Sequence, residues 1–221
     1  MLDTLETILD TGIVAIIRSD SPAGLLETVR ALAAGGVRAI EVTMTTPGAL
    51  EAISAAAAEA GDDFAIGAGS VRSGRDAERA LDAGAEFLVM PVAALDAVRV
   101  AKQRGKVACP GALSPTEAAT AWAAGADVIK IFPASFFGPA YIQALAAPMP
   151  EIRYMAVGGV DAGNAAAFLA AGACALGVGS SLIDRKAIAA GDWPALTRLA
   201  ERFVRTVAEA RPAGGGHAAP A

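Results

Sequence analysis

The stretch Val128-Ile-Lys-Ile-Phe-Pro133 predicts a short buried strand, because β-branched and aromatic residues run up to a proline that ends the strand. Lys130 is the one charged residue in this stretch. Burying a lysine costs free energy, and proteins seldom bury one without a reason. An amine held neutral in an apolar pocket is a nucleophile that can form a Schiff base with a carbonyl compound. The alternative is a structural lysine that reaches solvent at the sheet edge or pairs with a buried carboxylate.

Strand-like runs recur along the whole chain at a spacing of roughly 20–26 residues. Their ranges are 13–18, 39–44, 64–70, 87–91, 106–111, 128–133, 154–160 and 175–181. Alanine-rich segments with helical periodicity lie between them, and many of these segments end on a glycine. Eight such units predict a single α/β domain, a (β/α)8 TIM barrel. An open doubly wound sheet is the competing architecture, but the even spacing favours a closed barrel.

Further elements complete the predicted domain. An extra N-terminal helix is expected over residues 2–10, before the first strand, and a long last helix over residues 194–211. Four helix starts are predicted, three at the pairs Ser21-Pro22, Thr46-Pro47 and Ser114-Pro115 and one at Asp161. We therefore expect one barrel domain over residues 1–211. A Pro/Gly/Ala-rich tail over residues 212–221 is predicted to be disordered.

The composition is that of a core-rich globular chain, with 54% hydrophobic and 19% charged residues. No apolar run has the length of a membrane span, and no secretory signal begins the sequence, so we expect a cytoplasmic protein without membrane contact. A net charge of −5 without a basic cluster argues against nucleic-acid binding. Cys109 and Cys174 lie in apolar runs, which is typical of small buried side chains. The single histidine, His217, lies in the predicted tail, so we expect neither a catalytic histidine nor a zinc or iron site.

Polar residues at the ends of several predicted strands share the inward-facing parity. In a barrel, alternate residues point inward, and active sites form at the carboxyl ends of the strands. Glu41 and Thr43 share one face of the second strand, Arg18 ends the first strand, and Ser70 ends the third. The pattern predicts one pocket that holds these side chains together with Lys130. A glutamate and a lysine in such a pocket can neutralise each other or exchange protons.

Two glycine-rich segments end the seventh and eighth predicted strands, Gly158-Gly159 and Gly179-Ser180. Glycine lets the backbone approach an anion closely, and a helix N-terminus supplies amide donors. The loops after these two strands commonly bind phosphate in such barrels. The alternative is that the glycines only form tight turns. Their positions favour a phosphate site.

Several motifs, in this order, resemble those of the 2-keto-3-deoxy-6-phosphogluconate (KDPG) aldolase family, which includes 2-keto-3-deoxy-6-phosphogalactonate and 4-hydroxy-2-oxoglutarate aldolases. The motifs are Glu41-Val-Thr, Gly67-Ala-Gly-Ser70, Cys109-Pro-Gly111, Lys130-Ile-Phe-Pro-Ala134, Phe137-Gly-Pro139, Gly158-Gly159 and Gly179-Ser180. The resemblance covers nearly the whole chain. It implies a homotrimeric barrel that acts as a class I aldolase. Such an enzyme reversibly cleaves a 2-keto-3-deoxy-6-phospho sugar acid to pyruvate and glyceraldehyde 3-phosphate, without a metal or other cofactor.

The resemblance also implies roles for single residues. Lys130 would form the Schiff base with the keto acid, and Glu41 would transfer protons. Arg18, Ser70 and Thr43 would bind the substrate carboxylate. The pocket would be lined by Thr45, Pro91 and Phe132. The phosphate would be held by Gly158, Gly159, Gly179 and Ser180.

One position departs from part of the family, because Thr45 stands where some members carry an arginine. Galactonate-type relatives rely instead on an arginine of the first strand, where this chain has Arg18, so the C4 configuration of the substrate stays open. A 4-hydroxy-2-oxoglutarate aldolase is one alternative. A metal-free phosphosugar isomerase, epimerase or synthase with Glu41 as its base is another, and a non-catalytic binding protein on the same barrel is a third.

Overall fold

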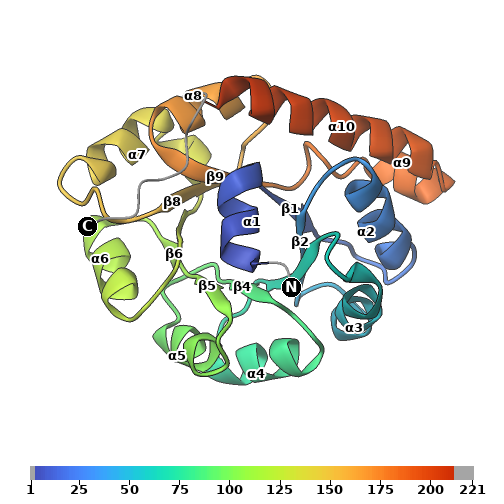
Figure 1. Cartoon of the computed structure of the whole chain (residues 1–221), viewed down its shortest axis with the longest axis horizontal. Coiled ribbons are helices and arrows are strands. Elements are labelled where there is room, and N and C mark those ends of the chain that lie inside the picture. The colour runs from blue at the N-terminus through green and yellow to red at the C-terminus, as the bar shows by residue number, and fades with distance from the viewer. Residues whose placement is uncertain (1–2, 212–221) are drawn as a thin grey trace.

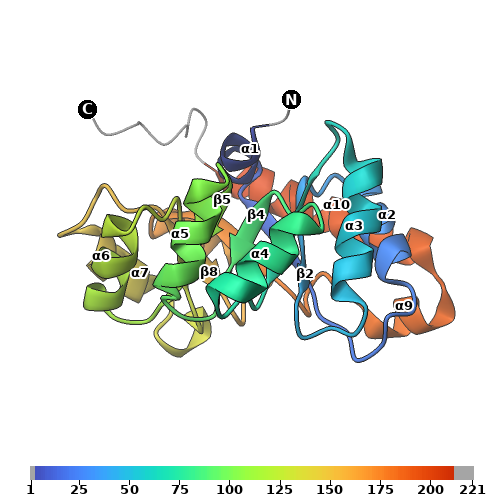
Figure 2. The ribbon, with the colours of Figure 1, turned by 90° about the horizontal axis from the view of Figure 1, so that it is seen from below.

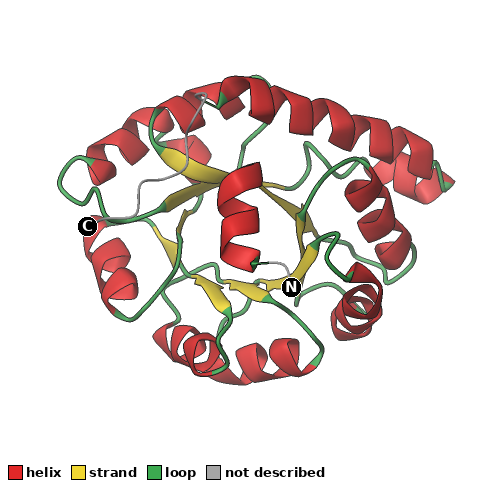
Figure 3. Ribbon diagram, in the orientation of Figure 1, coloured by secondary structure: helices red, strands yellow, loops and turns green. Residues whose placement is uncertain are grey.

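The computed structural model describes residues 3–211, and these residues form a parallel barrel surrounded by helices (Figures 1 and 3). The strands are β1 (Ile13–Ile17), β2 (Ala39–Thr43), β3 (Ala65–Gly69), β4 (Phe87–Val89), β5 (Val107–Cys109), β6 (Gly111–Ala112), β7 (Ile129–Ile131), β8 (Tyr154–Val157) and β9 (Ala173–Val178). Every pairing between neighbouring strands is parallel. The predicted α/β TIM barrel is confirmed.

Helices alternate with the strands and, apart from α1, form the outer ring of Figure 1. They are α1 (Thr4–Thr11), α2 (Leu25–Ala34), α3 (Ala49–Ala60), α4 (Gly74–Asp82), α5 (Leu95–Gln103), α6 (Pro115–Ala123), α7 (Pro139–Ala146), α8 (Ala165–Ala170), α9 (Arg185–Ala190) and α10 (Trp193–Ala210), with a 3-10 helix η1 (Ala134–Phe136). No helix among residues 3–211 is long and apolar enough to cross a membrane. The tail predicted over residues 212–221, with His217, lies outside the described residues.

Strands β5 and β6 are two halves of one predicted strand, interrupted at Pro110. Proline has no backbone N–H and cannot donate to a strand ladder. Its carbonyl nevertheless accepts a hydrogen bond from the Lys130 N–H at 2.9 Å. The first half pairs with β4 and the second half with β7. The eight predicted strands are therefore present, and the segment 107–112 closes the barrel by bonding to neighbours on both sides.

Glycine makes this closure possible. A Cβ atom at Gly111 would lie 2.5 Å from the backbone carbon and oxygen of Pro91, so a larger residue does not fit there. The Gly111 N–H donates to the carbonyl of Val92 at 3.2 Å. On the other side of the segment, the Asp127 carboxylate accepts from the Ala108 N–H at 2.8 Å, while the Asp127 N–H donates to the Ala108 carbonyl.

The barrel separates two apolar layers, as the alternation of side chains in a strand requires. Ile129 and Ile131 of β7 pack in the outer layer, between sheet and helices, whereas Val128 packs inside the barrel. Ile8 of α1 belongs to the inner cluster and is fully buried. Helix α1 therefore covers one end of the barrel, as Figure 2 shows from the side.

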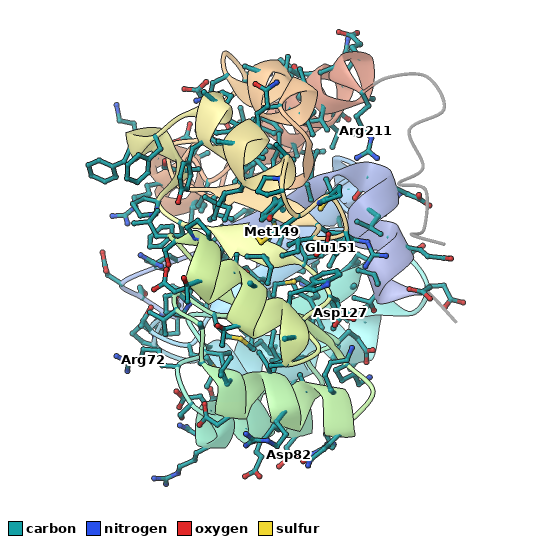
Figure 4. All side chains as sticks on the ribbon, turned by 90° about the vertical axis from the view of Figure 1, so that its left-hand side faces the viewer. Arg72, Asp82, Asp127, Met149, Glu151 and Arg211 are labelled. Carbon is teal, nitrogen blue, oxygen red and sulfur yellow. The ribbon has the colours of Figure 1, made fainter. Side chains whose placement is uncertain are left out.

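Helix α10 holds α1 in this position. The Arg211 guanidinium, at the end of α10, donates from Nη2 to the Leu9 carbonyl of α1 at 2.6 Å. Figure 4 places Arg211 beside α1 and Arg72, which follows β3, at the opposite end of the molecule. The amino-terminal end of the barrel is thus closed, and the carboxyl ends of the strands are left for the site.

One of the four predicted helix starts is confirmed. Ser114 caps α6 with a capping box, and Pro115 is the first residue of that helix. Helices α2 and α3 begin later than predicted, after Gly24 and Gly48. Both glycines adopt left-handed conformations, with φ of 73° and 72°. The predicted starts at Ser21 and Thr46 were wrong, because the chain first makes a loop that ends on the left-handed glycine. The predicted start at Asp161 was also wrong, since α8 begins at Ala165 after a turn.

Candidate active site

A cavity of about 270 Å³ lies at the carboxyl ends of the strands. It is lined by Ile16, Arg18, Glu41, Lys130, Phe132, Val157, Gly158, Gly159, Val160, Gly177, Gly179, Ser180, Ile183 and Arg185. The structure thus brings together the predicted arginine, glutamate and lysine with both glycine segments. Among residues 3–211, no group of three or more His, Cys, Asp or Glu side chains is placed to hold a metal ion.

Lys130 projects into this cavity from β7, where it is paired in register with Gly111 on one side and Met155 on the other. It is only 6% exposed, and its Nζ lies 4.8 Å from the centroid of the Phe132 ring. Burial lowers the pKa of the Lys130 amine, Glu41 acts in the opposite direction, and Arg18 lowers the pKa further. The neutral amine, which is the nucleophilic form, is therefore a larger fraction of Lys130 at a given pH than it is for a lysine in water.

Glu41 projects into the same cavity from β2 and is 1% exposed. Burial raises the pKa of the Glu41 carboxyl to about 7, although the positive charges of Lys130 and Arg18 oppose this rise. Its Oε2 has no hydrogen-bond partner among the described residues. A carboxyl group in this state can accept or release a proton near neutral pH.

The place of the Glu41 side chain depends on Gly69 of β3. A Cβ atom at Gly69 would overlap the Glu41 carboxyl group, with Cδ only 2.7 Å away. Alanine or any larger residue at this position would push the carboxyl group out of its place. Gly69, in the Gly67-Ala-Gly-Ser70 motif, therefore leaves space for the Glu41 carboxyl group; its role is not to form a turn.

Arg18 follows β1, and its Nη2 lies 3.4 Å from Oγ of Ser70. Ser70 has a φ of 57°, in the left-handed region, and is the only non-glycine residue among those described with a positive φ. Such strained backbone is often found at functional sites. This conformation turns the hydroxyl at the end of β3 toward Arg18, which itself lines the cavity.

Four predicted site residues do not line the cavity: Ser70, Thr43, Thr45 and Pro91. Ser70 reaches the site only through its contact with Arg18. Thr43 is fully buried, and its hydroxyl lies 3.2 Å from that of Thr45 and 3.0 Å from that of Thr46. The Thr46 hydroxyl accepts a hydrogen bond from the Ser19 N–H at 3.2 Å. These hydroxyls connect the end of β2 to the residue after Arg18. Contact of Thr43 and Thr45 with the substrate stays a prediction, and this geometry does not favour it.

The two glycine segments form one wall of the cavity. Gly158 and Gly159 adopt left-handed conformations, with φ of 92° and 73°. The carbonyl of Gly158 accepts from the Ser135 N–H at 3.1 Å, and that of Gly159 accepts from Nδ2 of Asn164 at 2.8 Å. In a trans peptide the N–H points away from the carbonyl. The amides that follow these two carbonyls therefore point away from Ser135 and Asn164.

The second segment is also a turn. The N–H groups of Leu182 and Ile183 both donate to the Gly179 carbonyl, at 2.9 and 3.0 Å. The next helix, α9, begins only at Arg185. The sequence predicted amide donors from a helix N-terminus here. The structure instead gives a single tight turn that carries Ser180.

Sequence analysis missed several residues of the cavity wall, of which Arg185 is the most important chemically. It lies six residues beyond Gly179, and no strand parity assigns it to the barrel mouth. Its signal is the pair Arg185-Lys186, which places basic residues just after the predicted phosphate segment. Ile16 and Gly177 could have been found from parity, since they alternate with Arg18 and Gly179.

The raised pKa of Glu41 can be measured directly. In protein labelled with 13C at glutamate carboxyls, the resonance that Glu41→Gln removes should titrate with a midpoint near pH 7. The group is neutral below this midpoint and ionised above it. Lys130→Met should move the midpoint further up, since the lysine charge favours the ionised form. Glu51→Gln on exposed α3 controls the assignment. A Glu41 midpoint below pH 5 would contradict the burial of this carboxyl group.

Known proteins with similar sequences share the whole barrel. The family model for KDPG and KHG (4-hydroxy-2-oxoglutarate) aldolases matches residues 5–199. The chain is 35% identical over 209 residues to a probable 2-dehydro-3-deoxy-6-phosphogalactonate aldolase of Rhizobium meliloti (strain 1021), a match that covers 94% of this chain and 95% of that protein.

Solved structures agree with this assignment. A native KDPGal structure superposes with a TM-score of 0.83 at 35% identity, over 90% of this chain and 95% of that one. A cube-shaped protein cage, designed by fusing symmetric oligomeric domains, superposes with a TM-score of 0.84 at 35% identity, over 90% of this chain and 73% of that one. The chain therefore belongs to the KDPG and KHG aldolase family.

Proposed function

We propose that this protein is a class I aldolase that cleaves a 2-keto-3-deoxy-6-phospho sugar acid to pyruvate and glyceraldehyde 3-phosphate. The observation that carries the proposal is the burial of Lys130 and Glu41 in one cavity, with the pKa of the amine lowered and that of the carboxyl raised to about 7. Family membership supports the reaction class, and the similar Rhizobium meliloti protein supports the substrate class.

The reaction begins with addition of the Lys130 amine to the C2 carbonyl of the keto acid. Loss of water from the resulting carbinolamine leaves a protonated imine. Glu41, or a water that it holds, removes the proton of the C4 hydroxyl, and the C3–C4 bond breaks. Its electron pair moves to the imine nitrogen, which gives the aldehyde product and an enamine. Protonation at C3 and hydrolysis then release pyruvate and regenerate the amine. The proton that Glu41 accepts is available for return to C3.

The substrate carboxylate is assigned to Arg18, supported by the Ser70 hydroxyl. Arg18 lines the cavity, and Ser70 holds its guanidinium group at the carboxyl ends of the strands. A guanidinium group binds a carboxylate through charge-assisted hydrogen bonds. The Phe132 ring, which lies against Lys130, supplies an apolar surface beside the reacting carbon.

The phosphate end is assigned to Gly158, Gly159, Gly179 and Ser180, on the part of the cavity wall that follows β8 and β9. The carbonyl orientation described above supports Gly158 and Gly159, because it leaves amide donors pointing away from Ser135 and Asn164. Gly179 and Ser180 are supported by their place in the lining of the same cavity. A 4-hydroxy-2-oxoglutarate aldolase is the competing function, because it needs the same lysine and glutamate but no phosphate site. The C4 configuration is proposed to be of the galactonate type, because Arg18 lines the cavity whereas Thr45 does not.

The first test concerns the imine. Treatment with pyruvate and borohydride should place one reduced adduct on Lys130, identified by peptide mass spectrometry. Lys130→Met should lower turnover by about 10³-fold or more, whereas Lys186→Met on the exposed side of α9 should leave it unchanged. Glu41→Gln should slow cleavage by about 10²-fold and still allow trapping. An adduct on another lysine, or none, would refute the mechanism.

A second test concerns the phosphate. We expect kcat/KM for the phosphorylated substrate to exceed that for its dephosphorylated form by about 10²-fold, or roughly 3 kcal/mol. Gly179→Asp should remove most of this preference by placing a negative charge in the site, and Gly179→Asn is the neutral control of similar size. Arg18→Ala should impair both substrates, since both carry the carboxylate. Equal efficiency of the wild-type protein on both forms would favour 4-hydroxy-2-oxoglutarate instead.

We also propose that the protein forms a homotrimer and is cytoplasmic. Apolar side chains are exposed after β4, after β6 and at the end of η1: Val92 is 56% exposed, Leu113 36%, Phe136 80% and Phe137 54%. Such exposure often marks a surface that a partner covers. The similar cage protein was designed from symmetric oligomeric domains.

The oligomer can be tested by sedimentation equilibrium, which should give three times the mass of the chain. Phe136→Asp should shift the mass toward that of the monomer, because a charge is costly to bury in an apolar interface. Ser54→Asp, on exposed α3, is the matched control and should keep the trimer. A monomeric wild-type protein would refute the assembly without affecting the proposed reaction.

A further inference from the structure

A second hollow adjoins the catalytic cavity at its mouth. It is a groove of about 640 Å³ between the loop after β1 and the segment from Ile183 to Trp193. Arg18, Ile183 and Arg185 line both the groove and the cavity. The long side chain of Arg185 therefore stands at the boundary between them, and the proposed mechanism gives it no task.

Within residues 3–211, Arg185 has one ion-pair partner. Its Nη1 lies 3.6 Å from Oδ2 of Asp20, on the loop after β1. The two side chains are 73% and 93% exposed, so water screens their attraction. Exposed ion pairs of this kind contribute little free energy. Another anion can therefore compete with Asp20 for the Arg185 guanidinium group.

The charges of the cavity indicate which anion this is. Four charged side chains line it: Arg18, Glu41, Lys130 and Arg185. Arg18 is assigned to the substrate carboxylate, and Lys130 is assigned to the imine. The glycine segments offer amides and a hydroxyl, but no positive charge. Of the positively charged residues that line the cavity, only Arg185 has no other assigned role. Arg185 is therefore the cation available to a phosphate dianion beside the glycine segments.

We propose that Arg185 binds the phosphate group of the substrate and exchanges it for Asp20 when the substrate leaves. This proposal rests on the proposed function for the identity of the substrate. Asp20 is then a competitor that holds the guanidinium group at the mouth, and Arg185 is a specificity residue for phosphorylated keto acids. It adds charge to a phosphate site that otherwise uses neutral donors. Guanidinium–phosphate pairs form strong charge-assisted hydrogen bonds.

The kinetic experiment compares Arg185→Gln with Lys186→Gln, which removes the same charge from the next residue, one that does not line the cavity. Arg185→Gln should raise KM for the phosphorylated substrate by about tenfold, the effect of one hydrogen bond to a charged group. The same substitution should leave KM for the dephosphorylated acid, and kcat for both substrates, within about twofold of the wild-type values. Lys186→Gln should leave all of them unchanged. An equal effect on both substrates, or on neither, would overturn the proposal.

Asp20→Asn tests the exchange itself. It should lower KM for the phosphorylated substrate by about two- to threefold, because the competing carboxylate is gone and exposed pairs are weak. In the Arg185→Gln background the same substitution should have no effect. If Asp20→Asn acts equally in both backgrounds, or leaves KM unchanged in the wild type, the pair does not compete with substrate.

A binding measurement separates this proposal from the aldolase reaction. Inorganic phosphate, titrated by calorimetry into the full-length protein, should bind several-fold more weakly to Arg185→Gln than to the wild type or Lys186→Gln. Failure of imine trapping on Lys130 would refute the reaction but would not change this result. An unchanged phosphate affinity in Arg185→Gln would refute the role of Arg185, whatever the reaction.

Discussion

The barrel depends on one segment, residues 107–112, which hydrogen-bonds to neighbouring strands on both of its edges. Without this segment the parallel strands would form an open sheet with two free edges. Closure fixes which side chains point inward, because alternation along a strand has a period of two. The backbone carbonyl of Pro110 accepts from Lys130 at this seam. The segment that closes the barrel thus also positions the residue with the most unusual chemistry.

Closure has an electrostatic consequence. Inward-facing charges lie where water has little access, so burial raises the pKa of Glu41 and lowers that of Lys130. Each shift moves its group toward the neutral form, while the attraction between the two groups opposes both shifts. The proton affinities of the two groups are therefore closer to each other than in water. This property suits a reaction that needs first a free amine and then a group that takes up and returns a proton.

The mouth of the cavity differs from its floor. The floor is built on strands, and its groups are held by register and by glycines, such as Gly69 against Glu41. The mouth is built on loops and is exposed, as the pair of Asp20 and Arg185 shows. Groups on strands are fixed with little freedom, which favours bond-making chemistry. Long side chains on loops can change partners, which favours capture and release of a charged substrate.

The sequence by itself determined the fold class, because eight even repeats of strand and helix leave few alternatives to a closed barrel. It also determined that Lys130, Glu41 and Arg18 share the cavity, since strand parity and strand ends are local properties of the chain. It failed at helices α2 and α3, where glycines end an extra loop that proline pairs did not reveal. Only the tertiary structure showed that Thr43 lies against the hydroxyls of Thr45 and Thr46 instead of lining the cavity, because strand parity does not predict how the chain turns after β2. Only the tertiary structure placed Arg185 at the cavity wall. Its position depends on how the loop after β9 folds back toward the loop after β1, and contacts between segments so distant in the chain leave no periodic trace in the sequence.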